Sequence, residues 1–342
     1  MSTAASFTIP YTQILNEKSE LTQALPKFAE NDNALIEMYQ AMVLTRCFDK
    51  KAIALQRTGK MGTYPSSLGQ EAISVAVGTV MQTDDVLIPY YREYGAQFIR
   101  GVSMKEILLY WGGDERGMDY QGPRKDFPIS VPIASQASHA IGIAYAMKHR
   151  NEARVAVAFF GDGSTSKGDF YEALNAAGVW NLPVVFVVNN NQWAISIPRE
   201  NQTACQTIAQ KALAGGISGE QVDGNDIIGL QQVMSNAIER ARKGNGPSVV
   251  EALSYRLCDH TTADDASRYR DEEEVKKAWQ KEPVERLRRY LERNNYWSDQ
   301  AEQTLLENCI AQVEEQVNAY LDTPPQAPES MFDFMFEKLP HD

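Results

Sequence analysis

The chain has 342 residues, of which 43% are hydrophobic and 23% are charged, and its formal net charge at pH 7 is −12. This length is sufficient for one large α/β domain with helical extensions or for two modest domains, and we favour one. The acidic charge argues against nucleic acid or an anionic membrane as a partner, because both bind basic protein surfaces.

Cysteine content and the amino-terminal sequence indicate a reduced compartment. The four cysteines have no metal-binding spacing and are few for a disulfide framework. No arginine occurs before Arg46, the first 20 residues lack the apolar core of a secretory signal, and no apolar run reaches membrane-spanning length. We therefore expect a cytoplasmic protein without a membrane partner.

The amino-terminal part predicts an irregular extension followed by a long helix. Residues 1–30 have no periodic pattern. From 31 to 56 apolar residues recur with helical spacing, and Asp32 or Asn33 is the expected N-cap.

Loops and a short strand follow this helix. Residues 59–70 form a segment rich in Gly, Ser and Pro before a further helix, and the apolar strand at 86–89 leads into a Tyr-Tyr-Arg segment at 90–92. Residues 108–128 contain too much Gly and Pro for regular structure and predict a long ordered loop.

The strongest chemical signal is a strand–helix–strand unit of about 30 residues. An apolar run at 155–160 ends at Gly-Asp-Gly (161–163), a helical segment follows, and a second apolar run at 184–188 ends at three asparagines. Neighbouring parallel strands with a right-handed crossover would place Asp162 and Asn191 at one carboxyl edge of the sheet, where α/β folds bind ligands.

These residue types suit a metal ion bound to a diphosphate. Mg²⁺ prefers oxygen ligands and commonly takes one or two carboxylates plus phosphate oxygens and water, which Asp162 and the amide oxygen of Asn191 fit. The glycines beside Asp162 permit close approach of the backbone, and the helix that begins near Lys167 can direct its first amides at an anion. Two ordinary turns are the alternative, but the paired spacing favours the site.

His260 is the sharpest single candidate among the four histidines. His341 lies in the tail, and His139 and His149 share one helical pattern that favours a structural role. His260 follows a predicted strand at 247–257 and lies in a polar loop.

The carboxyl-terminal part predicts charged helices up to residue 322, whose charges most simply lie on solvated faces. A Pro-rich break at 324–328 ends them. The apolar segment at 331–336 would be a liability if exposed, so we expect it to dock on a partner subunit or on its own domain.

The Gly-Asp-Gly and Asn-Asn pair at 161–163 and 190–191 is similar to the thiamin diphosphate motif. The flanking GDFYEALNAAGVW and NNNQWAIS resemble the alpha subunit of the E1 component of 2-oxo acid dehydrogenase complexes, closest to the heterotetrameric bacterial pyruvate dehydrogenase type. The likeness covers most of the chain. It implies a thiamin diphosphate-binding α/β fold with a largely parallel sheet flanked by helices, as one domain at 31–322 between an extension at 1–30 and a tail at 323–342.

The resemblance implies how the cofactor is held. Asp162 and Asn191 would ligate Mg²⁺ through their side chains and Trp193 through its backbone carbonyl, while Gly163 and Ser164 would contact the diphosphate through the backbone.

Residues upstream of this motif would complete the site. Tyr91 and Arg92 would hold diphosphate oxygens, a task suited to the planar, permanently charged guanidinium. Val131 and Ile133 lie in the segment that wedges between the two cofactor rings, with Ile133 as the wedge, and Tyr64 would face the substrate pocket.

The segment at 256–270 resembles the mobile active-site loop of the family. His260 would contact the diphosphate or act in the reductive transfer step, in a loop ordered by Arg256, Asp264, Tyr269 and Arg270. The chain departs from the family at Met118-Asp119, where a Met-His pair is common, so no role is assigned to that position.

Only one site of this type is found, and the resemblance places the catalytic glutamate and the pyrimidine pocket on a beta subunit. The chain is therefore predicted to be inactive alone and to work as an α2β2 heterotetramer docked on a lipoyl-bearing dihydrolipoyl acyltransferase. The implied reaction is oxidative decarboxylation of a 2-oxo acid, with pyruvate as first choice, and reductive acylation of the lipoyl group.

Other functions remain open at this point. A branched-chain 2-oxo acid or acetoin enzyme would share these motifs. A Mg-nucleotide module is weakened by the absence of a Walker-type GKS or GKT and of GxGxxG at the strand end. A scaffolding subunit without turnover is disfavoured by the intact candidate residues.

Overall fold

The computed structural model describes residues 3–333, 335, 337 and 338. Within them, six parallel strands form one sheet in the order β1-β7-β8-β4-β3-β2, and β5 pairs with β6 in a separate antiparallel hairpin. The strands are β1 Tyr11–Thr12, β2 Val86–Ile88, β3 Ala156–Gly161, β4 Val184–Asn190, β5 Trp193–Ala194, β6 Ile197–Pro198, β7 Ser218–Asp223 and β8 Ser248–Leu253.

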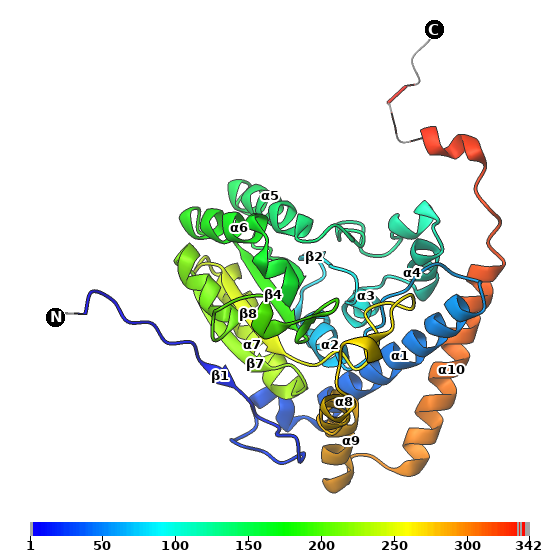
Figure 1. Cartoon of the computed structure of the whole chain (residues 1–342), viewed down its shortest axis with the longest axis horizontal. Helices are drawn as coiled ribbons and strands as arrows, with labels where there is room; N and C mark the ends of the chain where they lie inside the picture. The colour runs from blue at the N-terminus through cyan, green and yellow to red at the C-terminus, as the bar shows by residue number, and fades with distance from the viewer. Residues whose placement is uncertain (1–2, 334, 336, 339–342) are drawn as a thin grey trace.

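Helices cover both faces of the large sheet (Figure 1), which confirms the predicted α/β class. The α-helices are α1 Asp32–Arg57, α2 Glu71–Val80, α3 Tyr94–Ile99, α4 Met104–Trp111, α5 Ser135–His149, α6 Gly168–Val179, α7 Ile227–Arg242, α8 Glu272–Trp279, α9 Pro283–Arg293 and α10 Asp299–Leu321. The 3₁₀ helices are η1 Lys27–Glu30, η2 Glu115–Met118, η3 Asp162–Ser166, η4 Arg199–Asn201, η5 Ile208–Gly215, η6 Ala266–Arg268 and η7 Pro328–Phe332.

Side chains of β3 alternate between two apolar clusters, because successive residues of a strand point to opposite faces. Val157 and Phe159 belong to the cluster that contains the buried residues of α1, α2 and α7. Ala156, Ala158 and Phe160 belong to the cluster formed with α5 and α6. Burial on both faces explains why this strand reads as a continuous apolar run.

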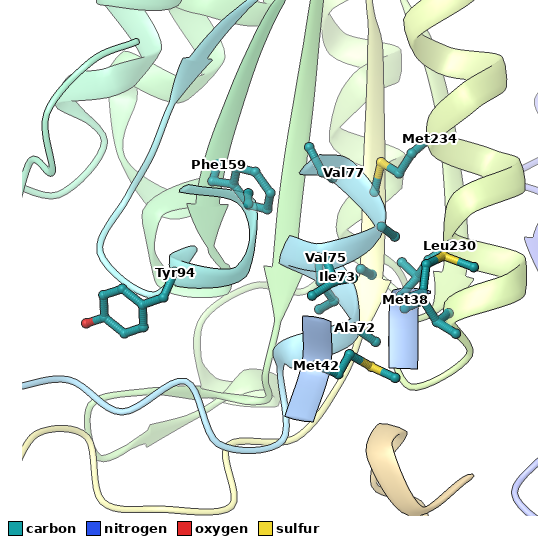
Figure 2. Close-up of a cluster of buried hydrophobic side chains, with 14 of the residues drawn as sticks. Met38, Met42, Ala72, Ile73, Val75, Val77, Tyr94, Phe159, Leu230 and Met234 are labelled. Carbon is teal, nitrogen blue, oxygen red and sulfur yellow. The ribbon is translucent and has the colours of Figure 1, made fainter. Parts of the chain in front are cut away.

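Figure 2 shows the centre of the first cluster, where side chains of α1, α2 and α7 meet beneath the sheet. The labelled residues are Met38, Met42, Ala72, Ile73, Val75, Val77, Tyr94, Phe159, Leu230 and Met234. All are buried. This packing fixes the position of α2. The residue directly before α2 lines the site described below.

The long first helix was predicted correctly, but its cap was not. α1 begins at Asp32, and Asn31 is the N-cap, with extended backbone (φ −93°, ψ 108°) and a side chain that accepts a hydrogen bond from the Asn33 backbone N–H at 3.1 Å. The predicted caps Asp32 and Asn33 lie one and two residues inside the helix. An N-cap must be non-helical, and Asn31 is the residue that meets this requirement.

The two ends of the described chain differ in their contacts. β1 adds a short strand to the edge of the sheet beside β7, whereas the segment after α10 extends away from the domain (Figure 1). There Met331, Phe332 and Met335 are 67%, 47% and 60% exposed, so the described part of the chain leaves much of each side chain uncovered. The predicted tail residues Phe334 and Phe336 and the tail histidine at 341 lie outside the described residues.

Across the part of the chain that the structure describes, no helix combines the length and apolar character needed to cross a membrane.

Candidate functional site

The strand–helix–strand unit folds as its spacing predicts. β3 and β4 are adjacent and parallel, with Gly161 opposite Asn189. Asp162 therefore leaves β3 at the same edge of the sheet at which Asn191 leaves β4. The crossover between them consists of η3 and α6.

A cavity of about 210 Å³ lies at this edge and collects most of the predicted site residues. Its walls include Tyr91, Arg92, Ile133, Asp162, Gly163, Ser164, Asn191, Trp193 and His260. Val131 and Tyr64 are not among the residues that line it.

Gly163 is required by a close approach rather than by an unusual backbone angle. A Cβ added there would lie 2.7 Å from the Cβ of Ala194 in β5, so the loop can lie against the β5–β6 hairpin only with glycine at this position. Beside it, the Asp162 carboxylate is 2% exposed and accepts a hydrogen bond from Gln202 Nε2 at 2.7 Å. Burial raises the pKa of Asp162 to about 6.

The three consecutive asparagines point to different partners. Asn190 donates to Glu251 Oε1 of β8 at 2.7 Å, which gives it a structural role. Asn189 and Asn191 each donate through Nδ2 to Gln70 Oε1 at 2.9 Å. The side chains of Asn189 and Asn191 consequently share the cavity wall, while Asn190 lies outside it.

Two buried arginines make the cavity electropositive. Arg92 donates to the backbone carbonyls of Ser66 and His260, and Arg256 donates to those of Trp193 and Ile195. Among the described residues neither guanidinium forms a salt bridge with a carboxylate. A buried positive charge without a counter-ion favours an anionic ligand.

His260 lies between these two guanidiniums as a neutral imidazole. Its Nδ1 is 3.2 Å from Arg92 Nη2 and 3.3 Å from Arg256 Nη1. Both arginines can only donate, so Nδ1 must accept and the ring proton must reside on Nε2. Burial and the charges of Arg92 and Arg256 lower the pKa of His260 to about 3.

The loop that carries His260 is ordered by the residues that the sequence suggested. Arg256 Nη2 donates to the Tyr269 hydroxyl at 2.8 Å, and that hydroxyl bonds Asp264. Asp264 in turn accepts the His260 backbone N–H at 2.9 Å, and Arg270 donates to the Arg256 carbonyl. The backbone of the loop is therefore fixed on both sides of the imidazole.

Strained backbone also gathers around the cavity. Ala134, Gln192 and Ile195 have φ angles of 66°, 73° and 56°, in the left-handed region that is costly for residues with a Cβ, most of all for a β-branched one. Ala134 directly follows Ile133, and Ile195 lines the cavity. Such outliers cost about 1–3 kcal/mol each and cluster at functional sites.

Tyr64 and Val131 stand apart from the cavity. Tyr64 is fully buried, its hydroxyl donates to Asp49 Oδ1 at 2.9 Å and its ring stacks on Tyr94 with centroids 5.4 Å apart. Its backbone N–H donates to Thr262 Oγ1 at 3.0 Å, which links its loop to the His260 loop. Val131 is 47% exposed. Contact of either side chain with substrate or cofactor stays a prediction.

Several cavity residues were missed by sequence reasoning; they include Gln70, Tyr90, Glu93, Asn189 and Ile195. Tyr90 and Glu93 flank the predicted Tyr-Arg pair, so their position in the chain was a usable signal. Glu93 is fully enclosed, accepts the backbone N–H groups of Tyr90 and Arg92, and has its pKa raised by burial to about 7. No local pattern singles out Gln70.

The unsatisfied atoms of the site define what could bind there. Gln70 Nε2, Ser164 Oγ and Gln202 Oε1 are buried without a hydrogen-bond partner among the described residues. Buried polar groups are normally satisfied, so a ligand with oxygen atoms would complete them. A cation here could be held by Asp162, by Asn191 and by the Trp193 carbonyl.

These oxygen atoms suit a hard cation that is bound by the protein and by the phosphate ligand together. No cluster of three or more His, Cys, Asp or Glu side chains suited to a metal occurs within the described ranges. One carboxylate plus neutral oxygens is too few for an all-protein cage, but it matches Mg²⁺ that takes further oxygens from a phosphate and from water. The residues present therefore fit a metal–diphosphate group.

Comparison with known proteins agrees with this geometry. The family model described as dehydrogenase E1 component matches residues 39–329. The chain is 40% identical over 302 residues to 3-methyl-2-oxobutanoate dehydrogenase subunit alpha of Mycobacterium tuberculosis (88% of this chain, 82% of that protein). It is 40% identical over 302 residues to the pyruvate dehydrogenase E1 component subunit alpha of Acholeplasma laidlawii (88% and 86%) and 36% identical over 331 residues to that of Bacillus subtilis (96% and 89%).

The matched region contains every residue of the cavity, from Gln70 to His260. The chain belongs to the dehydrogenase E1 component family, and its similarity to the alpha subunits of that family extends over most of its length.

Proposed function

We propose that the chain is the alpha subunit of a thiamin diphosphate-dependent 2-oxo acid dehydrogenase E1 component. In this role it decarboxylates a 2-oxo acid, with pyruvate as first choice, and passes the acyl group reductively to the lipoyl group of a dihydrolipoyl acyltransferase. The family is thiamin diphosphate-dependent. The observation that carries the proposal is the meeting of Asp162 and Asn191 at one sheet edge, in a cavity lined by Arg92 and by His260, which Arg256 contacts. Both arginines are buried and have no carboxylate partner among the described residues.

The side chains divide the work of binding. Asp162 and Asn191 would hold Mg²⁺ through oxygen atoms, together with the Trp193 carbonyl, which also accepts from Arg256 at 3.3 Å and has a second lone pair. The backbone of Gly163 and Ser164 would receive the diphosphate. A bound Mg²⁺ would lower the pKa of Asp162 again despite burial, since a nearby positive charge favours the ionised carboxylate.

The remaining groups neutralise and orient the anion. Arg92 adds a permanent positive charge at the cavity wall. The Tyr91 hydroxyl accepts a hydrogen bond from Tyr90 at 2.6 Å, so its own proton is available for an oxygen of the ligand. Ile133 would hold the cofactor bent by packing between its two rings. When bound, the cofactor supplies the nucleophilic thiazolium carbon of the reaction.

His260 would act as a neutral hydrogen-bond donor. Its Nδ1 is committed to two arginines, so Nε2–H is the group that it can offer to an oxygen of the substrate or the diphosphate. With its pKa lowered to about 3, the ring keeps one proton throughout the physiological pH range. Donation from a fixed neutral group stabilises negative charge that develops on a nearby oxygen.

The chain would work with other subunits. Alpha subunits of this family work with a beta subunit and the core of the complex. We extend this to an α2β2 heterotetramer in which the beta chain provides the catalytic glutamate and the pyrimidine pocket, docked on a lipoyl-bearing acyltransferase in the bacterial cytoplasm. The exposed apolar residues Met331, Phe332 and Met335 are consistent with cover by another subunit.

The choice of 2-oxo acid is the most specific part of the proposal. Relatives named for pyruvate and for 3-methyl-2-oxobutanoate both reach 40% identity, so identity does not separate these substrates. Pyruvate is preferred because several pyruvate dehydrogenase alpha subunits match up to 96% of the chain.

The decisive experiment is ferricyanide-linked oxidation by the chain copurified with its beta subunit, in the presence of thiamin diphosphate and Mg²⁺. Pyruvate, 3-methyl-2-oxobutanoate and acetoin are compared as substrates, and pyruvate is expected to give the highest kcat/KM. The matched control is a complex with Asp162→Ala, which should be inactive. Turnover by the alpha chain alone at the rate of the complex, or no turnover of any of the three compounds, would contradict the proposal.

A further inference from the structure

Gln70 lies outside every motif that the sequence analysis singled out, yet it lines the candidate cofactor cavity. It precedes α2, is 1% exposed and lines the cavity at the carboxyl edge of the sheet. It comes from a loop more than 80 residues before β3. α2 packs against α1 and α7 (Figure 2), and Gln70 is the residue directly before α2.

The orientation of the Gln70 amide follows from a fixed donor. The backbone N–H of Trp193 donates to Asn191 Oδ1 at 3.2 Å, and a backbone N–H cannot reverse its role. Asn191 must therefore present Nδ2 on its other side, where it lies 2.9 Å from Gln70. Two donors cannot bond each other, so the Gln70 atom at this contact is the oxygen.

A second asparagine strengthens the same assignment. Asn189 Nδ2 donates to Gln70 Oε1 at 2.9 Å, while its Oδ1 accepts from the Ser254 hydroxyl at 2.8 Å. Gln70 Oε1 thus accepts two hydrogen bonds, which use both of its lone pairs. The Gln70 nitrogen therefore points away from both asparagines.

That nitrogen is left without an acceptor. Gln70 Nε2 is buried and has no hydrogen-bond partner among the residues that the structure describes. A buried amide without a partner is costly to desolvate, so native proteins retain such groups chiefly where something else completes them. The cavity that Gln70 lines is also the place where Arg92 and Arg256 favour an anion.

We propose that Gln70 is a further residue of the cofactor site: its Oε1 fixes the Asn191 amide so that Asn191 Oδ1 faces the metal ion, and its Nε2 donates a hydrogen bond to an oxygen of the bound metal–diphosphate group. This inference rests on the function proposed above. It assigns Gln70 a positioning role through Asn191 and a direct contact of its own.

Two substitutions separate these roles. Gln70→Leu removes both the acceptor and the donor at nearly constant volume. Gln70→Glu keeps an oxygen for Asn189 and Asn191 but replaces the donating nitrogen with a second acceptor, which repels phosphate oxygens. The positioning of Asn191 should survive in the Glu variant and fail in the Leu variant.

Gln97 provides a matched control. It is likewise 1% exposed, with Nε2 bonded to the Tyr120 hydroxyl at 2.9 Å and Oε1 unpartnered among the described residues. It lies in α3 and does not line the cavity. Gln97→Leu should therefore lower the thermal stability much as Gln70→Leu does, and leave cofactor binding unchanged.

The test is calorimetric titration of the complex with the beta subunit, first with thiamin diphosphate at saturating Mg²⁺ and then with Mg²⁺ at saturating thiamin diphosphate. Gln70→Leu should raise the Mg²⁺ concentration for half-saturation by about 10- to 100-fold, as loss of a group that orients a metal ligand does. Gln70→Glu should keep the wild-type Mg²⁺ requirement and weaken thiamin diphosphate binding by more than about tenfold.

Each result has a defined meaning. A Leu variant with the wild-type Mg²⁺ requirement would overturn the positioning of Asn191, and a Glu variant that binds thiamin diphosphate like the wild type would overturn the donated hydrogen bond. If Gln70→Leu does not fold, Gln70→Gly replaces it in the same titration, because it also removes the oxygen and the nitrogen of the side-chain amide. Failure of the wild-type complex to bind thiamin diphosphate would instead overturn the proposed function, and the inference with it.

Discussion

The amino edge of the central sheet and the cavity at its carboxyl edge contain similar buried polar side chains in opposite states of pairing. At the amino edge, Asp85 directly precedes β2, and its carboxylate accepts both Nη atoms of Arg242 at 2.9 and 2.8 Å and the Val155 backbone N–H at 2.9 Å. Beside it, Arg100 bonds Asp126 and the Asp85 carbonyl. Each of these charges has an opposite charge in contact.

At the carboxyl edge the pairing is incomplete. Arg92 and Arg256 bond carbonyls, a hydroxyl and His260 rather than carboxylates. The Asp162 carboxylate accepts from an amide, and Gln70 and Ser164 each have a buried polar atom that no described residue bonds. Burial alone therefore does not distinguish a functional site from a structural one. Unsatisfied bonding capacity that faces a cavity does, because a buried network that is complete has nothing left for a ligand.

The largest expected effect is at the incomplete edge. Asp162→Ala removes the only carboxylate among the three proposed ligands, which leaves the charges of the diphosphate without their counter-cation. We expect thiamin diphosphate binding by the complex to weaken by about two to four orders of magnitude, equivalent to breaking a buried charge pair. Calorimetry in the presence of Mg²⁺ measures this directly. Tight binding by the folded variant would refute the metal assignment.

The corresponding change at the complete edge should affect stability alone. Asp85→Ala leaves Arg242, which is 10% exposed, with the more exposed Glu239 carboxylate at 3.1 Å as its remaining acidic partner among the described residues. The free energy of unfolding should fall by about 3 kcal/mol, near the lower end for a broken buried pair because Arg242 has some access to water. Urea unfolding of the cofactor-free complex measures the loss. Cofactor affinity below the unfolding transition should stay within about twofold of the wild type, and a larger change would show that the two edges are coupled.

The sequence predicted this functional edge because its signals are local. Strand ends, glycine turns and the length of one crossover determine where Asp162 and Asn191 lie in the chain. The parallel pairing of the two strands then brings both residues to the same edge of the sheet. Ligand types followed from chemistry and from the family resemblance. The distinction between Asn190 and Asn191 depends on side-chain alternation and on the position of Glu251 in β8, which only the three-dimensional sheet reveals.

Other features had no local signal. Gln70 reaches the site through the packing of α2, a contact between segments far apart in the chain. β1 has two residues and β7 reads Ser-Gly-Glu-Gln-Val-Asp, so neither shows an apolar alternation that would predict a strand. Tyr64 was predicted to face the substrate from the family resemblance of its loop; its hydroxyl bonds Asp49 in the core, and its contact with substrate stays a prediction.

The pH dependence of stability should separate the two edges further. Burial and the neighbouring arginines lower the pKa of His260 to about 3. Protons then bind the unfolded chain more readily than the folded one, so this imidazole supports the fold fully above its unfolded pKa of about 6.5 and progressively less as pH falls toward 3. The His260→Asn variant has no imidazole at this position, so it does not lose stability on acidification in this way. The stability advantage of the wild type over the variant should shrink below pH 6.5 by at most about 1.4 kcal/mol per pH unit.

Chemical unfolding of both proteins at pH 7, 6 and 5, without cofactor, measures this difference. Arg242→Lys, at the complete edge, is the control, since it alters a charge pair that contains no histidine and lies at the other edge of the sheet. A wild-type advantage that is constant or grows on acidification would show that His260 is protonated in the folded cavity.

The smallest expected effect tests whether a single hydroxyl completes the anion site. Tyr90 donates its hydroxyl proton to Tyr91 at 2.6 Å, so the Tyr91 proton is the one free for a ligand. Tyr91→Phe should weaken thiamin diphosphate binding about 2- to 12-fold, the value of one hydrogen bond. Tyr90→Phe removes only an indirect contact and should have a smaller effect. A larger loss in Tyr90→Phe than in Tyr91→Phe would reverse the direction of this hydrogen bond and assign the ligand contact to Tyr90.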